Sequence, residues 1–517
     1  MLDLGTSFLA SLDRAPDGLA LVDGPVRLTY RQWYERISAA VAGLDALGLR
    51  PGDHLVTVLQ NRWEAATLHW ACQFAGVVMT PLNWRAKPDE VDFCLDDCDA
   101  TAVVFEEVSA ASVRESTRAG AVRRVALEDA LPGEYAFADL LALDAEPAVP
   151  RVGAEAWSLM LYTSGTTSQP KGVPRRHRAE RAAAVAHVAQ NLYRRGERTL
   201  GVMPLYHTMG VRSLLSMSLI AGAFVCLPRF DVARALELIE SERITNLYLV
   251  PTLYHDLVHH ERFAAADISS VRKLGFAGAS MTTGLLRQLD AAFRPELFVN
   301  HYGSSEIYTF TIDQDATRKP GSAGRSGINQ RIGVAKLGTT SAHDRAAPGE
   351  EGEIVALLAG DEAFEGYWRR PDADAKALRD GWYFTGDTGY IDPEGDLFVT
   401  GRVDDMIITG GENVSPVEIE SCLSLHPAVA EVAVVGLPDE RWGKVVAAFV
   451  KRRGDVGEAE LDAFCRESGL ANYKRPRRIV FVQDIPKSPV GKLLRRKLVA
   501  GEYAPETPSR SDKQASP

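Results

Sequence analysis

An alternation of strand-like and helix-like segments runs through about the first 310 residues and constrains the fold more than any other feature. Residues 29–49 place apolar side chains at helical spacing and stop at Gly48, and residues 54–59 form a short apolar run typical of a strand. Residues 62–83 have the pattern of a helix, a buried strand and a turn. This order predicts an α/β fold in which helices cover mostly parallel sheets, with ligands at loops that follow the strands.

The pattern of the sequence changes after about residue 320, where the strand-like and helix-like segments become shorter and richer in turn residues. Residues 380–402, with their Pro-Glu-Gly turn, have the pattern of antiparallel hairpins. The following hundred or so residues mix helix and strand, which predicts a small α+β domain. We therefore expect a large N-terminal domain over residues 1–402 that ends in a β-rich subdomain, a C-terminal domain over 405–502 and a polar, disordered tail over 503–517.

Composition excludes several functional classes. The chain carries 58 Lys and Arg against 69 Asp and Glu, a formal net charge of −11, whereas proteins that bind nucleic acid by releasing counterions need the opposite balance. The first residues lack the pattern of a signal peptide, and the most apolar stretch, 217–227, is shorter than the roughly 20 residues that span a bilayer. We expect a cytoplasmic protein that acts on small molecules, with neither nucleic acid nor membrane as a partner.

Residues 156–174 run an apolar strand into a loop of glycine and small hydroxyl residues, followed by a lysine. Backbone N–H groups and hydroxyls in such a loop can point at one anion, and the lysine adds a positive charge. The residues that we expect to contact the phosphates of a nucleotide are Thr163, Ser164, Gly165, Thr166, Thr167 and Lys171.

A Walker-type nucleotide loop is the obvious alternative, because Gly165 precedes Lys171 by the required interval. However, Pro170 replaces the second glycine of that motif, and Gly172 replaces its magnesium-binding hydroxyl residue. Proline also lacks the N–H group that such a loop uses to bind phosphate. The Walker interpretation therefore fails, and a plain Ser/Thr-rich connector is the remaining alternative.

This loop and six later segments, in order, resemble the adenylate-forming superfamily, which includes acyl- and aryl-CoA ligases, peptide-synthetase adenylation domains and luciferases. The segments are PLYHTMG (204–210), FAGASM (276–281), HYGSSE (301–306), YFTGDTG (383–389), GRVDDMIITGGENVSPVEIE (401–420) and PKSPVGKLLRRKL (486–498). The chain looks closest to the 4-chlorobenzoate–CoA ligase-like branch. The resemblance implies an ATP-dependent ligase that forms an acyl-AMP with release of pyrophosphate and then a thioester with coenzyme A.

The resemblance also assigns the nucleotide site. Glu306 would hold the Mg2+ that bridges phosphate oxygens, with Ser304 and Ser305 beside the nucleotide. The family usually has threonine before this glutamate, and Ser305 keeps the hydroxyl. Asp387 and Arg402 resemble the pair that binds the ribose hydroxyls.

Lys492 carries the sharpest assignment that the resemblance implies. The C-terminal domain would deliver this lysine to the oxygens that join the carboxylate and the α-phosphate, where a cation offsets developing negative charge. A solvated lysine in the basic segment that ends at Lys497 is the alternative. Asp404 matches the hinge, residues 403–404, about which the small domain rotates between the two half-reactions.

For coenzyme A, the resemblance points to Gly411 beside the pantetheine arm, and to Trp442, Tyr473 and Arg475 beside the nucleotide portion. For the acid, it points to a pocket in which His207 orients or gates the carboxylate; a structural histidine is the alternative. The pocket residues are His207, Thr208, Met209, Tyr248, Ala279, His301, Gly303, Tyr308 and Thr309. Small Ala279 and Gly303 are expected to leave room for a flat ring, and the polar residues favour a ring acid with a polar substituent.

Three other functions remain open. One is a straight-chain fatty acyl–CoA ligase, and another is a free-standing adenylation enzyme that loads a carrier protein. A catalytically silent nucleotide-binding protein is the third, although ATP binding alone does not require Lys492. The resemblance also implies a possible homodimer. We expect ATP, Mg2+ and coenzyme A to take part in the reaction.

Overall fold

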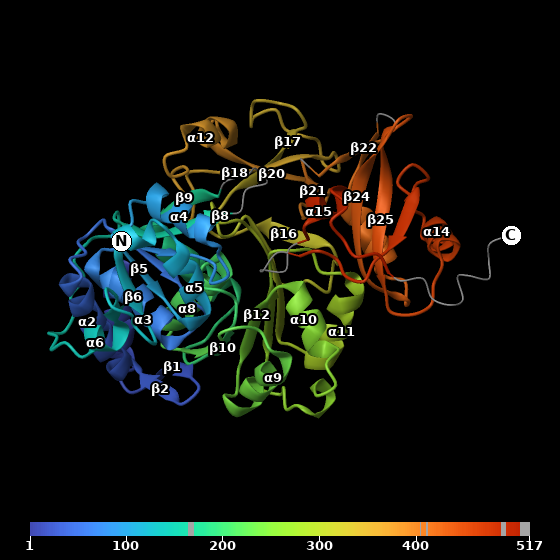
Figure 1. The fold of residues 1–517 in the computed structure, drawn as a ribbon. Helices are drawn as coiled ribbons and strands as arrows, with labels where there is room; N and C mark the ends of the chain where they lie inside the picture. Colours follow the sequence, from blue (N-terminus) through green and yellow to red (C-terminus); the bar gives the residue numbers. More distant parts are fainter. Residues whose placement is uncertain (164–169, 404, 410–411, 488–492, 507–517) are drawn as a thin grey trace.

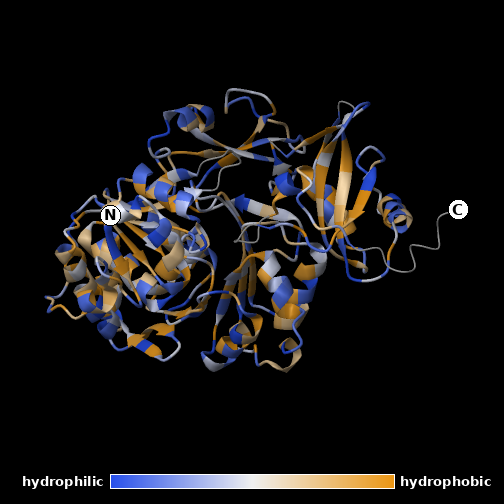
Figure 2. Ribbon diagram, viewed as in Figure 1, coloured by the Kyte–Doolittle hydropathy of each residue, from blue (hydrophilic) through white to orange (hydrophobic). Residues whose placement is uncertain are grey.

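A computed structural model describes residues 1–163, 170–403, 405–409, 412–487 and 493–506 of the chain. It has the predicted α/β architecture, with a large N-terminal part built on two sheets and a smaller C-terminal part to one side (Figure 1). Apolar residues concentrate on the strands, and polar residues gather on the outer helices (Figure 2).

The larger sheet has 14 strands and combines a parallel with an antiparallel half. Strands β10 to β14 pair parallel, whereas β14 and the strands after it pair antiparallel, so the predicted hairpin region is confirmed. The strands are β1 Leu19–Asp23, β2 Val26–Thr29, β10 Arg198–Gly201, β11 Ala223–Cys226, β12 Asn246–Leu249, β13 Lys273–Phe276, β14 Leu297–Tyr302, β15 Thr311–Asp313, β16 Ser322–Ser326, β17 Ile332–Lys336, β18 Gly352–Leu357, β19 Leu378–Arg379, β20 Trp382–Ile391 and β21 Leu397–Arg402.

The second sheet has seven strands in the order β7-β6-β5-β3-β4-β8-β9. All neighbours pair parallel except β8 and β9, which form the antiparallel hairpin around the predicted phosphate loop. The strands are β3 His54–Val58, β4 Val78–Pro81, β5 Ala102–Phe105, β6 Arg123–Ala126, β7 Tyr135–Ala136, β8 Trp157–Thr163 and β9 Lys171–Arg176.

Two helices are buried on every side, as expected for helices between two sheets. In α3 (Trp63–Ala75) every residue after Trp63 is buried, and in α8 (Thr208–Leu219) every residue before Leu219 is buried. One apolar cluster combines α3 and α8 with strands of both sheets. The other N-terminal helices are α1 Leu4–Arg14, α2 Tyr30–Ala46, α4 Pro88–Asp97, α5 Glu107–Glu115, α6 Phe137–Leu141, α7 His177–Gln190, α9 Val232–Ser241, α10 Pro251–Val258, α11 Thr283–Phe293 and α12 Pro371–Ala377, with short 3-10 helices Ala119–Ala121 and Phe263–Ala265.

The C-terminal part has its own three-stranded sheet and its own apolar clusters. Helix α13 of this part contacts β21, and the Ser415 hydroxyl donates a hydrogen bond to the carbonyl of Thr400. The elements are β22 Ile407–Thr409, β23 Glu412–Val414, α13 Pro416–Leu423, β24 Val429–Asp439, β25 Gly443–Arg452, α14 Glu458–Glu467, β26 Arg478–Phe481 and α15 Arg495–Val499.

The prediction that the tail is disordered from Tyr503 onward is wrong for its first four residues. The ring of Tyr503 packs edge-on against that of Phe449, with the ring centroids 4.9 Å apart. The N–H of Glu506 donates to the carbonyl of Phe481 at 3.0 Å, and the carboxylate of Glu506 pairs with Arg452 at 2.7 Å. An aromatic contact and an ion pair outweigh the polar composition of these four residues. Residues 507–517 lie outside the described part.

Among the described residues, the helices are all too short or too polar to cross a bilayer.

Gly76 offers a test of the junction after α3. It ends the helix with φ +73°, and a Cβ at this position would come within 2.5 Å of Val152 Cγ1. We expect Gly76→Ala to destabilise the fold by the 1–2 kcal/mol or so of a left-handed residue, plus about 1–3 kcal/mol for overpacking.

Gly52 is the matched control, because it also has a positive φ (+92°) but a Cβ at this position would have nothing within 4 Å. Gly52→Ala should therefore show the backbone cost alone. Thermal unfolding midpoints measure the difference, and equal shifts for the two variants would contradict the packing argument.

Candidate functional site

Glu306 lies in the turn that follows β14, and its side chain is buried. One carboxylate oxygen accepts a hydrogen bond from the Tyr367 hydroxyl at 2.7 Å, and the Tyr383 hydroxyl lies 3.4 Å from that of Tyr367. The backbone is fixed as well, because the carbonyl of Glu306 accepts from the N–H of Phe364 at 2.9 Å. A carboxylate held in this way can bind a cation without reorganising.

Lys171 begins β9 directly opposite Thr163 at the end of β8. Its Nζ lies 4.1 Å from the centroid of the Tyr367 ring, the same tyrosine that binds Glu306. Burial lowers the pKa of Lys171, and the neighbouring Glu306 carboxylate opposes that shift. The described end of the predicted phosphate loop thus meets the predicted metal-binding carboxylate. Ser164, Gly165, Thr166 and Thr167 lie outside the described residues.

Ser304 and Ser305 form a tight turn before Glu306. The N–H of Ser304 donates to the carbonyl of Ile307 at 2.9 Å, and the Ser304 Oγ accepts from the N–H of Ile307 at 3.4 Å. A Cβ on Gly303 would lie 2.1 Å from the carbonyl oxygen of Tyr308. Gly303 therefore permits the close approach of two backbone segments, and the Tyr308 carbonyl takes up the space where a side chain would begin.

Asp387 and Arg402 lie opposite each other on β20 and β21, and they form an ion pair at 2.6 Å. The other oxygen of Asp387 accepts from the Tyr302 hydroxyl at 2.6 Å, so the pair is tied to β14. Burial opposes the positive charge of Arg402, but Asp387, together with Tyr383 and Tyr302, holds the pKa of Arg402 above its usual value. The predicted ribose-binding pair is assembled at the same strand, β14, that leads into Glu306.

A buried ion pair lies behind this region. Arg175 on β9 pairs with Glu180 on α7, and both side chains are fully buried. Burial opposes the charge of Arg175, but Glu180, together with Tyr308 and Glu362, raises the pKa of Arg175 above its usual value. The guanidinium also donates to the carbonyl of Glu306 at 3.0 Å and lies 3.9 Å from the centre of the Tyr308 ring. Sequence reasoning missed this pair; two adjacent arginines, Arg175 and Arg176, at the end of a strand were the available signal.

His207 caps the start of α8, where its Nδ1 accepts from the N–H of Met209 at 3.4 Å. Thr208 and Met209 are buried in the first turn, and the Thr208 hydroxyl lies 3.4 Å from the His207 Nδ1. His207 is half-buried at the start of the helix. This position is compatible both with a histidine that orients the carboxylate of the acid and with a structural histidine. Ala279, in contrast, lies exposed on the loop after β13.

The remaining predicted acid-pocket residues meet in a buried polar group that we call the acid-side cluster. It contains Tyr248, His301, Tyr308 and Thr309, all predicted, together with His187 and Arg212, which sequence reasoning missed. The rings of His187, Tyr248 and His301 lie 4.8 to 5.0 Å apart, centroid to centroid.

Arg212 is the centre of the acid-side cluster. Its guanidinium donates to the Tyr308 carbonyl at 3.1 Å, to the Thr309 hydroxyl at 2.9 Å and to the Tyr248 hydroxyl. Burial, strengthened by the Arg212 charge, holds the pKa of His301 well below its usual value, so this imidazole is neutral. An arginine in the middle of an apolar and serine-rich helix was the sequence signal for this site.

The predicted coenzyme A residues lie at one end of the C-terminal sheet. Because β25 and β26 are parallel, Trp442 before β25 and Tyr473 before β26 lie at the same end of the sheet, where both strands begin. Both rings are exposed, 46% for Trp442 and 43% for Tyr473. Arg475 is held by Asp462 at 3.0 Å. Lys492, Asp404 and Gly411 lie outside the described residues, so their assigned roles stay predictions.

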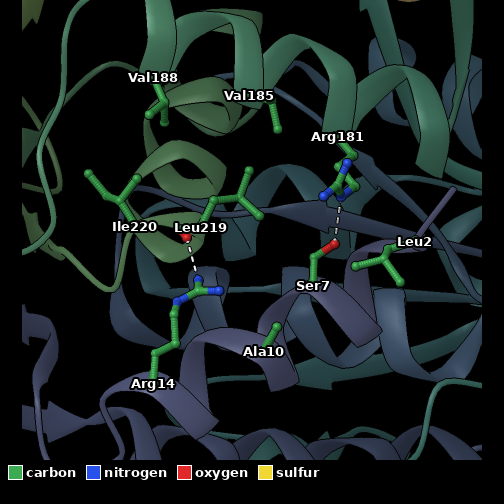
Figure 3. A pocket seen from close by; sticks show the side chains of 9 residues that line it. All are labelled: Leu2, Ser7, Ala10, Arg14, Arg181, Val185, Val188, Leu219 and Ile220. Carbon is green, nitrogen blue, oxygen red and sulfur yellow. Dashed lines mark hydrogen bonds between the residues drawn. The ribbon is translucent and has the colours of Figure 1, made fainter.

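A separate cavity of about 210 Å³ lies between α1, α7 and the end of α8 (Figure 3). Its arginines are engaged: Arg181 donates to the Ser7 hydroxyl at 3.0 Å, and Arg14 donates to the carbonyl of Leu219 at 2.6 Å. Helix α7 therefore turns Glu180 and His187 toward the candidate site and Arg181 toward this cavity. The two places are distinct.

Comparisons with known proteins agree with this geometry. A family model described as "AMP-binding enzyme" matches residues 8–368, and one described as "AMP-binding enzyme C-terminal domain" matches residues 418–492. The chain therefore belongs to the family of AMP-binding, adenylate-forming enzymes.

Individual relatives narrow the class. A 4-chlorobenzoate–CoA ligase from Arthrobacter sp is 34% identical over 96% of this chain and 95% of its own. A long-chain-fatty-acid–CoA ligase from Mycobacterium tuberculosis is 33% identical over 91% of this chain and 92% of its own. The crystal structure of ATP-bound MatB from Rhodopseudomonas palustris matches with a TM-score of 0.86 and 27% identity, over 97% of this chain and 99% of that chain. The protein is an enzyme of the AMP-forming acid–thiol ligase class.

The Arg175–Glu180 pair can be tested by removing one or both charges. We expect Arg175→Met alone to cost about 3–5 kcal/mol of stability, because it leaves Glu180 buried without its partner. Arg175→Met combined with Glu180→Gln should cost less than the single change. Chemical denaturation measures both, and a double variant that loses the sum of the two single losses would contradict the assignment.

Proposed function

We propose that the protein is an ATP-dependent acid–CoA ligase that acts on an aromatic or cyclic monocarboxylic acid. In the first step a carboxylate oxygen attacks the α-phosphorus of ATP and pyrophosphate leaves. In the second, the thiol sulfur of coenzyme A loses its proton and attacks the acyl carbonyl carbon, and AMP leaves. The observation that carries the proposal is the meeting of Lys171 and Glu306 at Tyr367, beside the Asp387–Arg402 pair.

Glu306 fits a magnesium ligand. Mg2+ in nucleotide sites is bound through one or two carboxylates plus phosphate oxygens and water. One oxygen of the Glu306 carboxylate is oriented by Tyr367, which leaves the other for a cation. When bound, Mg2+ would neutralise phosphate charge. Lys171 would contribute a second positive charge to the same phosphates, and Asp387 would accept hydrogen bonds from the ribose.

The acid would lie between His207 and the acid-side cluster. Three aromatic rings, His187, Tyr248 and His301, pack against one another there, with centroids 4.8 to 5.0 Å apart. A rigid wall of rings suits a planar or cyclic acid better than a flexible chain. A fatty acyl–CoA ligase is the second candidate, because one relative at 33% identity is named as a long-chain-fatty-acid–CoA ligase.

Pyrophosphate release tests the proposal directly. Purified enzyme is given ATP, Mg2+ and one acid at a time from a panel of benzoates, cinnamates, cyclohexane acids and fatty acids. We expect ring acids to give the highest kcat/KM. Thioester formation is then compared with coenzyme A and with a carrier protein as acceptor. A preference for fatty acids would contradict the proposed function and indicate a fatty acyl–CoA ligase. A preference for the carrier protein would indicate an enzyme that loads a carrier protein.

Substitution of Lys492 is expected to affect one half-reaction and not the other. We expect Lys492→Ala to lower acyl-AMP formation by about 100-fold or more, because the positive charge between the two anions is lost, and to spare thioester formation from added acyl-AMP. Lys497→Ala is the control, since Lys497 is exposed on α15. An equal loss in both half-reactions would refute the role of Lys492.

Trp442 tests the coenzyme A surface. An exposed indole that stacks on the adenine should contribute about 1–3 kcal/mol. We expect Trp442→Ala to raise the KM for coenzyme A about 10-fold and to leave pyrophosphate release with ATP and acid unchanged. Tyr135→Ala is a control, because Tyr135 is equally exposed at 45% on β7. A rise in the KM for ATP instead would show that Trp442 does not belong to the coenzyme A surface.

A further inference from the structure

Arg212 is a buried cation whose described hydrogen-bond acceptors are uncharged. The residue is 2% exposed and is the fifth residue of α8, a helix buried between the two sheets. Its acceptors are a phenol, a hydroxyl and a carbonyl, from Tyr248, Thr309 and Tyr308. Burying a charge costs free energy unless strong acceptors compensate it. Neutral acceptors compensate it only in part.

Two buried nitrogens of the acid-side cluster, the Nε of Arg212 and the Nδ1 of His301, have no partner among the described residues. The Nε2–H of His301 donates to the Asn191 amide oxygen at 3.1 Å, so Nδ1 of the neutral ring is an acceptor and only the Arg212 Nε–H is an unpaired donor. Most buried polar groups in folded proteins are hydrogen-bonded, so this unpaired donor indicates a missing oxygen acceptor.

Glu362 is a nearby carboxylate that makes no described hydrogen bond to Arg212. It is buried and accepts from the Asn329 amide at 3.2 Å. Burial raises the pKa of Glu362, and the charge of Arg212 opposes that shift. Its second oxygen, Oε2, has no hydrogen-bond partner among the described residues. Glu362 therefore interacts with Arg212 through space and leaves the guanidinium able to bind an additional acceptor.

The position of Arg212 along α8 indicates which part of a substrate it would meet. His207 caps the helix, and Arg212 lies five residues further, about 7.5 Å along the axis at roughly 1.5 Å per residue. Five residues also turn the helix by about 140°, so the two side chains leave α8 in different directions, and a group bound near Arg212 is distinct from a carboxylate that reacts near His207. The reacting carboxylate and the group near Arg212 are therefore different groups of one substrate.

We propose that Arg212 is a specificity-determining residue, which selects acids that carry a second oxygen acceptor, a carbonyl or carboxylate, at the end opposite the reacting carboxylate. This inference rests on the proposed function and narrows its substrate class. Arg212 supplies the guanidinium donor for that oxygen. An acid that ends in a methyl group leaves the Arg212 Nε–H unpaired, which a buried polar site discriminates against strongly.

The test uses benzoates and cyclohexane acids in matched sets, in which the position opposite the carboxylate bears a methyl, an acetyl or a second carboxylate group. The readout is kcat/KM for pyrophosphate release. We expect the wild-type enzyme to favour the acetyl or carboxylate acid over the methyl acid by about 10-fold or more. In Arg212→Met this ratio should fall about 10- to 100-fold, with the KM for ATP unchanged.

Arg234→Met on α9 is the matched control, because the Arg234 side chain is 43% exposed on a helix that contacts β10 of the larger sheet. The ratio should not change in this variant. If Arg212→Met does not fold, Arg212→Lys keeps the charge without the planar fork, and its ratio should still fall several-fold. A wild-type preference for the methyl acid, or a ratio unaffected by either substitution, overturns the inference. Failure of the proposed function looks different: no acid of the panel then releases pyrophosphate.

Discussion

The candidate site depends on the buried ion pair between Arg175 and Glu180. Arg175 belongs to the seven-stranded sheet, whereas the turn with Glu306 follows β14 of the larger sheet. One guanidinium holds Glu180 on one side and the Glu306 carbonyl on the other, and the Tyr308 hydroxyl donates to Glu180 at 3.1 Å. A buried pair of this kind adds little net stability. Its hydrogen bonds connect the two sheets near the point where Lys171 meets Glu306.

The fold and half of the site were predictable from local patterns, for physical reasons. Helix and strand periods follow from which side chains are buried, so the α2–β3–α3–β4 order was predicted correctly. Asp387 and Arg402 were predicted as a pair from family motifs, and adjacent antiparallel strands bring them opposite each other. The acid-side cluster was only partly predictable. His187, Arg212 and Tyr248 come from three separate elements, and only the packing of α7 and α8 against β12 brings them together.

The proposed nucleotide site and the proposed coenzyme A site differ in how far their side chains are already ordered. On the nucleotide side, Glu306, Asp387 and Arg402 already have fixed partners, so ligand binding does not have to order them. On the side of the C-terminal sheet, Trp442 and Tyr473 are exposed aromatic rings at one end, while Arg475 is oriented by Asp462. Exposed rings together with an oriented cation suit a ligand with both a base and a phosphate.

The polar residues of α8 show why Arg212 differs from its neighbours. Ser213, Ser216 and Ser218 are equally buried, but their hydroxyls donate at 2.6 to 3.0 Å to carbonyls one turn back in their own helix. Such hydroxyls are satisfied within the helix and need no outside acceptor. The guanidinium of Arg212 is too long for that, and all its described hydrogen bonds reach β12 or the segment after β14. A charge placed where both sheets enclose it is costly to keep, and a substrate oxygen that completes its hydrogen bonds would explain why it is kept.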